Sequence, residues 1–203
     1  MESDDLRRRE ILVAVLDILK RDGVAGLSTA ALAAEARCSK STLYALFGSR
    51  AGILKALISE QSRSVNEMLG RELASVGDPE RTLVDAGAAL LDLLTGDASA
   101  AINKAAMADA TGELGQLLLE QGRGRTAPLF AQLIARLQAA GGIGAADAAF
   151  VFKSFYGLLV GDRQIRILLG DRGARPSGGE FRSIAAEAVA RLKLLFPAST
   201  PTA

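Results

Sequence analysis

The chain contains no histidine or tryptophan, a single cysteine, and only 4% aromatic residues. Without histidine it lacks the commonest metal ligand and the usual general base near neutral pH. The lone Cys38 excludes an internal disulfide framework. Its carboxylates show no metal-ligand spacing, and its glycine pairs lack the preceding strand of a phosphate-binding loop. We therefore expect neither an enzyme nor a metal or cofactor site.

Long apolar runs are also missing. Asp, Glu, Lys or Arg interrupts every candidate before the roughly 20 residues that a membrane span requires. The N-terminal residues Met-Glu-Ser-Asp-Asp carry the wrong charge for a signal peptide. These features predict a cytoplasmic protein without membrane contact. The net charge is only +1, so affinity for nucleic acid would have to come from locally placed cations and helix N-termini.

What the chain does contain is apolar residues at helical spacing. It is 49% hydrophobic over 203 residues and rich in Ala and Leu, a composition that suits closely packed helices. No segment has the alternating pattern of a strand. We predict an all-α fold with a three-helix N-terminal domain (1–47), a larger helical domain (48–196) and a disordered Pro/Ser/Thr tail (197–203).

Residues 28–50 are the most informative segment. Leu32, Ala33 and Ala36 form one apolar face, and Ser39 is placed as the N-cap of a second helix that turns Leu43 inward. Two helices joined by a tight turn present the second helix to a DNA major groove. The outer side of that helix carries hydroxyls, a cation and a phenol that can contact DNA: Ser39, Lys40, Ser41, Thr42 and Tyr44. Ser28 and Thr29 start the preceding helix, where free N–H groups can also bind phosphate.

The segment resembles the DNA-binding domain of TetR-family transcriptional regulators. The resemblance covers roughly residues 7–58 and is carried by Leu32-Ala33, Cys38 to Tyr44, Phe47, Ser49-Arg50 and Ile53-Leu54, with Ile11, Ala14, Leu19 and Gly23 upstream. It implies that Arg50 contacts the DNA backbone. Two positions depart from the family pattern. Arg37 replaces the usual turn glycine, which is costly if its φ is positive. Ala45-Leu46 replaces an aromatic or histidine pair, so the operator sequence cannot be transferred from relatives.

Further helices are predicted along the chain. The first runs from about Asp4 to Asp22, and a long helix starts at Ser49 and continues towards Val76. Asp78-Pro79-Glu80 predicts another helix start, and a short helix follows through Ile102 and Met107. Gly122 and Gly124 lower the local helix propensity and favour a break, but the periodicity from Thr111 to about Ala140 favours one helix, bent at most, and this is the prediction. The apolar stretch 146–169 predicts a buried helix, and Ser177 with Glu180 forms a capping-box pattern before the last helix.

The C-terminal part is similar to the ligand-binding half of AefR-like members of the family. Gly112-Glu113-Leu114, Tyr156 to Gly161 and Leu168-Leu169-Gly170 carry this looser resemblance. It implies a homodimer and a pocket for a small molecule between helices. The pocket-lining candidates, by analogy only, are Met68, Leu91, Met107, Leu118, Phe152 and Tyr156. Each of them, taken singly, is also an ordinary core residue.

The sequence thus predicts a transcriptional regulator that binds a near-palindromic double-stranded DNA operator as a homodimer. The resemblance implies a repressor released by an apolar or amphipathic small-molecule effector. Two alternatives remain open. One is a constitutive DNA-binding regulator without an effector, and the other is a helical module that binds protein instead of DNA.

Overall fold

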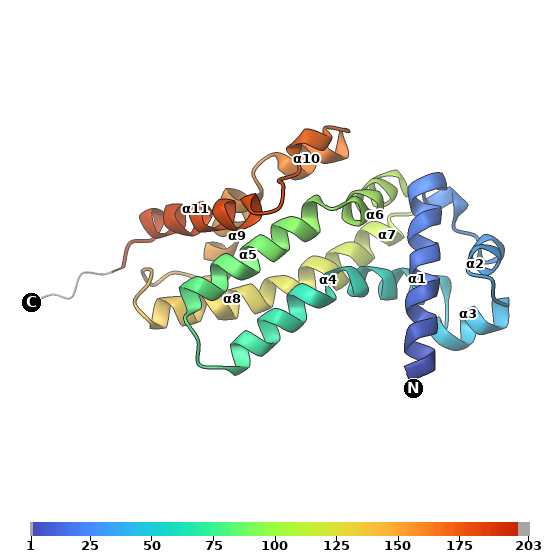
Figure 1. Cartoon of the computed structure of the whole chain (residues 1–203), viewed down its shortest axis with the longest axis horizontal. Helices are drawn as coiled ribbons and strands as arrows, with labels where there is room; N and C mark the ends of the chain where they lie inside the picture. The colour runs from blue at the N-terminus through green and yellow to red at the C-terminus, as the bar shows by residue number, and fades with distance from the viewer. Residues whose placement is uncertain (1, 199–203) are drawn as a thin grey trace, which may run out of the picture. The chain divides into compact units, whose positions relative to one another are not determined.

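Most residues of the computed structural model, which describes residues 2–198, lie in helices (Figure 1). No strand occurs within that range, and the predicted all-α fold class is confirmed. The helices are α1 (Glu2–Asp22), α2 (Thr29–Glu35), α3 (Lys40–Phe47), α4 (Arg50–Ala74), α5 (Pro79–Thr95), α6 (Asp97–Ala108), α7 (Glu113–Leu117), α8 (Gly124–Ala139), α9 (Ala148–Val160), α10 (Arg163–Leu168) and α11 (Glu180–Leu195). Short 3₁₀ turns η1 (Val24–Gly26) and η3 (Arg172–Ala174) and a π-helical turn η2 (Leu118–Arg123) complete the order.

The residues pack into two compact units. Unit 1 comprises Met1–Ser62 and Asp97–Arg123, and unit 2 comprises Arg63–Gly96 and Gly124–Ala203. The helix-turn-helix segment therefore shares its packing unit with α6 and α7. The division expected after residue 47 concerns function rather than packing, and it stays a prediction.

The core of unit 1 is built from the apolar faces of short helices against α1. Helix α1 contacts α2 and α6, and α2 contacts α3 (Figure 1). Ile11 and Val15 of α1 are fully buried, and Leu32 of α2 and Leu43 of α3 are at most 2% exposed. Burial of each such side chain contributes about 1.5–3 kcal/mol. This core holds α3 with one face inward and the other in solvent.

Unit 2 is a bundle around an aromatic cluster. Helix α5 packs against α8 and α11, and α9 packs against α8 and α11. The Phe130 ring stacks on Phe152 with centroids 5.0 Å apart and lies 6.2 Å from Phe155. A Cβ on Gly87 of α5 would lie only 2.8 Å from the tip of the Phe155 ring. The glycine therefore permits the close approach of α5 to this cluster.

Residues 113–139 form one helical run, as the periodicity favoured. Its glycines do not break it; instead the turn containing Gly122 winds as a π-helix over Leu118–Arg123. Within that turn Gln121 is buried (9% exposed), and its Oε1 has no hydrogen-bond partner among the residues described. Such π turns are rare and often mark functional positions.

The prediction of a single helix over 146–169 is wrong. Helix α9 ends at Val160 because Gly161 takes up φ = +54°, and α10 starts afresh at Arg163. The start signal at Asp78 is confirmed, because Asp78 accepts hydrogen bonds from the N–H groups of Glu80 and Arg81. The capping box expected at Ser177 is only half formed: Ser177 donates its N–H and hydroxyl to Glu180, but α11 has Gly179 as its N-cap and no side-chain cap bond. Of the expected disordered tail, residues 199–203 lie outside the described range.

Candidate nucleic-acid interface

The turn between α2 and α3 is a Schellman motif with Arg37 at its left-handed position. The Cys38 N–H donates to the Ala33 carbonyl at 2.9 Å, and the Arg37 N–H donates to the Ala34 carbonyl at 3.1 Å. Arg37 has φ = +48°, a conformation that glycine adopts at little cost and other residues avoid. The departure from glycine seen in the sequence is therefore accommodated by backbone strain rather than by a different turn.

Arg7 of α1 fixes the same helix end from outside. Its Nη2 donates to the carbonyls of Ala36 at 2.9 Å and Arg37 at 3.1 Å, while its Nη1 pairs with Glu10 at 2.6 Å. A cation at a helix C-terminus is favoured by the helix dipole. The turn that orients α3 is thus tied directly to α1.

The start of α3 carries a cluster of exposed hydroxyls. Ser39 is the N-cap, and its Oγ accepts the Thr42 N–H at 3.0 Å. The same oxygen lies 2.6 Å from the Ser41 Oγ and 2.8 Å from the Thr42 Oγ1. Lys40 is exposed beside them and has no ion pair among residues 2–198. Hydroxyls, an ammonium group and the first N–H groups of the helix form a set of donors suited to phosphate oxygens.

Tyr44 joins this cluster to the start of α2. Its side chain is 50% exposed, and its hydroxyl lies 3.5 Å from the Thr29 Oγ1. Ser28, the N-cap of α2, accepts the Ala31 N–H at 3.1 Å. Leu43, the residue before Tyr44, lies on the inner side of α3 and is only 1% exposed. The predicted contact residues of α2 and α3 therefore share one polar surface, and their contact with DNA stays a prediction.

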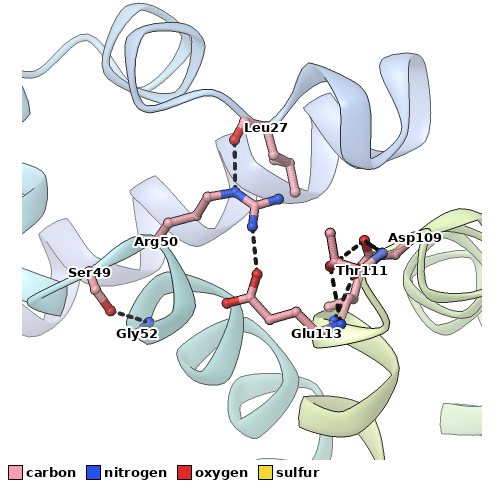
Figure 2. A network of polar contacts seen from close by, with 8 residues as sticks. Leu27, Ser49, Arg50, Gly52, Asp109, Thr111 and Glu113 are labelled. Atoms are coloured by element: carbon pink, nitrogen blue, oxygen red, sulfur yellow. Dashed lines mark hydrogen bonds and ion pairs between the residues drawn. The ribbon is translucent and has the colours of Figure 1, made fainter.

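Arg50, the first residue of α4, is engaged within the protein (Figure 2). Its Nε donates to the Leu27 carbonyl at 3.1 Å, and its Nη1 pairs with the Glu113 carboxylate at 2.9 Å. Ser49 caps α4 by accepting the Gly52 N–H at 3.0 Å. Contact between Arg50 and DNA remains a prediction, but it would have to replace or share the Glu113 contact.

The predicted pocket residues divide between the two units. Met68, Leu91, Phe152 and Tyr156 lie in or against the core of unit 2. Leu118 packs against the core of unit 1, and Met107 of the same unit is 69% exposed. The Tyr156 hydroxyl donates to Gln164 at 3.2 Å, and its ring lies 6.3 Å from Phe152. Tyr156 therefore offers a polar group at the edge of the aromatic cluster.

Several interactions at the interface carry no sequence signal. The Arg50–Glu113 pair joins residues 63 positions apart, and Arg7 reaches its acceptors across 29 and 30 positions. Arg8 lies over the Phe47 ring at 5.5 Å. Such pairs depend on how helices cross. Among the described residues, no group of three or more acids and cysteines is arranged to hold a metal ion, and none of the helices described is long and apolar enough to cross a membrane.

Two family models match the chain. That of the bacterial regulatory proteins of the TetR family matches residues 11–57, and that of the C-terminal domain of AefR-like transcriptional repressors matches residues 81–192. The second covers more than half of the chain. None of the curated proteins matches the chain in sequence.

Solved structures agree with these matches. A TetR transcriptional regulator from Agrobacterium tumefaciens is 33% identical in sequence, with a TM-score of 0.74 over 95% of this chain and 95% of that one. A TetR-family regulator from Mesorhizobium loti is 20% identical, with a TM-score of 0.76 over 95% of this chain and 98% of that one. FadR from Bacillus subtilis, solved with stearoyl-CoA, is 15% identical, with a TM-score of 0.70 over 91% and 96%. These last two likenesses establish the fold alone.

Members of this family are DNA-binding transcriptional regulators rather than enzymes. The helix-turn-helix geometry, the two family models and the Agrobacterium relative lead to one assignment. The chain belongs to the TetR family of transcriptional regulators, and its C-terminal part is of the AefR-like type.

Proposed function

We propose that the protein is a homodimeric repressor that binds a near-palindromic operator through α3 and is released by an apolar or amphipathic effector. The observation that carries the DNA-binding part is the polar surface of α2 and α3, backed by buried Leu32 and Leu43. Lys40 and Tyr44 face the major groove and its phosphates in this proposal, together with the hydroxyls of Ser39, Ser41 and Thr42. Ser28 and Thr29 contribute the start of α2.

The test is selection of bound duplexes from a random DNA pool, followed by binding measurements on the selected duplex. Lys40→Ala and Tyr44→Ala should each weaken binding, and removal of one phosphate contact should reduce the salt slope by about 0.9. Lys104→Ala is the matched control because it removes an exposed lysine of unit 1 on α6. If the selection recovers no duplex, or if Lys104→Ala has the same effect, DNA binding through α3 is refuted and a protein-interaction module is favoured.

Dimerisation is proposed through the outer faces of α9 and α11. These helices pack against each other in unit 2 and leave large apolar side chains in solvent: Phe150 is 56% exposed and Leu194 is 81% exposed. Small exposed residues, Gly157, Ala186 and Ala190, lie on the same helices and would let a second copy approach closely. A homodimer would bring two α3 helices to half-sites about one helical turn apart, roughly 34–36 Å.

Leu194→Glu tests this interface without touching the core. Sedimentation velocity should give a dimer for the unchanged chain and a monomer for the variant, because two buried carboxylates would face each other across the interface. Val76→Glu, in which the replaced side chain is fully exposed outside α9 and α11, should leave the dimer intact. A monomeric unchanged chain, or a dimeric Leu194→Glu variant, contradicts the proposed interface.

The effector is proposed to bind in unit 2 beside the aromatic cluster, where Met68, Leu91, Phe152 and Tyr156 lie. Leu118 and Met107 stay secondary candidates. The fold is shared with FadR, which is solved with stearoyl-CoA, an amphipathic molecule. An effector can release DNA only by its difference in affinity for the two protein states.

Because the chain has no tryptophan, Tyr156→Trp provides a single fluorescent reporter for the effector site. Titration with dodecanoate and dodecanol should shift its emission saturably and release the selected duplex at matching concentrations. Val76→Trp, at a fully exposed position between α4 and α5, is the control reporter. If neither probe changes emission or DNA affinity, the proposed effector chemistry is refuted and the constitutive regulator is favoured.

A further inference from the structure

The guanidinium of Arg50 is held by groups from two distant parts of unit 1. The Leu27 carbonyl accepts its Nε, and the Glu113 carboxylate pairs with its Nη1 at 2.9 Å (Figure 2). Leu27 directly precedes Ser28, the N-cap of α2. The guanidinium therefore lies next to the helix start that we propose as a phosphate site. Both side chains of the pair remain partly accessible, at 35% for Arg50 and 41% for Glu113.

A second carboxylate strengthens the negative field at this place. Asp109 accepts the Leu114 N–H at 2.9 Å, the Thr111 N–H at 3.1 Å and the Thr111 hydroxyl at 2.7 Å. The Leu114 N–H and then the Thr111 hydroxyl lower the pKa of Asp109, and the charge of Arg50 lowers it further. The Thr111 Oγ1 also accepts the Glu113 N–H at 3.3 Å. The turn between α6 and α7 is thus closed by the hydrogen bonds of Asp109, while the Glu113 carboxylate pairs with Arg50.

A guanidinium binds a carboxylate and a phosphate through the same fork of N–H groups. Glu113 therefore occupies, through Nη1, an N–H group of Arg50 that a DNA phosphate would also use. Because the pair is partly exposed, it is weak enough to be exchanged: exposed ion pairs contribute about 0.2–1 kcal/mol. The hydrogen bond from Arg50 to the Leu27 carbonyl can persist when the contact with Glu113 is broken.

We propose that Glu113 is a positioning residue that holds the Arg50 guanidinium back in the free protein, so that operator binding must exchange this carboxylate for a phosphate. The inference rests on the proposed DNA binding through α2 and α3. It assigns to Glu113 the role of an internal competitor that lowers operator affinity. The turn between α6 and α7, which carries Glu113, then controls whether the Arg50 guanidinium can bind a DNA phosphate.

The test is a double-mutant cycle measured with the full chain and the selected duplex. Glu113→Gln should raise affinity by about 1.4- to 5-fold near 0.1 M salt, the worth of an exposed ion pair. Arg50→Gln should weaken binding and lower the salt slope by about 0.9, one phosphate contact. In the Arg50→Gln background, Glu113→Gln should change affinity no further, because its effect acts through Arg50.

Two controls separate this role from general charge and from folding. Glu120→Gln removes the same charge from a nearby exposed acid whose carboxylate accepts from Gln116 rather than from an arginine, and it should leave affinity nearly unchanged. Thermal unfolding should show that every variant is folded at the assay temperature.

The outcomes are distinct. If Glu113→Gln lowers affinity, the pair is a structural support and the proposal is overturned. Equal gains from Glu113→Gln and Glu120→Gln, or a gain that persists without Arg50, also overturn it, since net charge then explains the effect. If the unchanged chain binds no duplex, the proposed function itself has failed, which no result on Glu113 alone would produce.

Discussion

Replacing Arg37 by glycine should stabilise the protein, although it deletes a large side chain. Arg37 sits at φ = +48° in the Schellman turn after α2, and the left-handed region costs a residue with a Cβ roughly 1–2 kcal/mol. Glycine removes that cost but adds conformational entropy to the unfolded chain, which offsets about 0.5–1 kcal/mol. The net gain in the free energy of unfolding is therefore about 0.5–1 kcal/mol.

Three variants isolate the backbone from the side chain. Arg37→Gly should raise Tm by about 1–4 °C in a chain of this size. Arg37→Asn should give part of that gain, since Asn tolerates the left-handed region better than other residues with a Cβ. Arg37→Ala keeps the strain and loses the exposed side chain, so it should leave Tm nearly unchanged.

Differential scanning calorimetry and urea unfolding give the two measurements. The Arg7 hydrogen bonds go to the main-chain carbonyls of Ala36 and Arg37 and so persist in every variant. If Arg37→Gly and Arg37→Ala are equally stable, or if Arg37→Gly is less stable than the unchanged chain, strain at this turn does not have the stated cost.

Three further predictions concern stability. Gly87→Ala should lower the free energy of unfolding because the new Cβ would lie 2.8 Å from Phe155. Gly70→Ala in α4, where a Cβ would meet no atom within 4 Å, should raise the free energy of unfolding by about 1 kcal/mol. The opposite order of stability in urea unfolding would contradict the packing described around Gly87. Gln121→Leu should stabilise the chain, because it removes a buried oxygen without a partner, and a lower Tm would reveal an unrecognised partner. Because the pKa of Asp109 is lowered by the Leu114 N–H, its stabilisation is present above its unfolded pKa and lost as pH falls through the folded value. Because the chain has no histidine, Tm should stay level between about pH 8 and pH 5 and fall below pH 5. The fall should be less steep for Asp109→Asn, and a step in Tm near pH 6.5 would contradict this prediction.

Local interactions allowed the sequence to determine the helices and the polar surface of α3. Caps act over two or three residues, so Ser28, Ser39 and Asp78 could be recognised as helix starts from their neighbours alone. The apolar period then fixed which side of α3 is buried, and it placed Leu43 inside and Lys40 outside. The tight turn at Arg37 followed from the two recognisable helices beside it, whereas its left-handed φ was indicated only by the family resemblance, in which glycine is usual at this position.

Tertiary structure decided what depends on helices crossing. The Gly161 break turned one apolar segment into α9 and α10, although a glycine within a helical pattern does not by itself end a helix. The opposite occurred at Gly122, where the run continued through a π turn. The partners of Arg7 and Arg50 are set by where α2 and α7 lie relative to α1 and α4, and other carbonyls or carboxylates of the chain could have accepted the same hydrogen bonds. Residue identity and short spacing therefore determine each helix and its exposed face, whereas the choice among distant partners requires the packed chain, because it follows from geometry that no local sequence window contains.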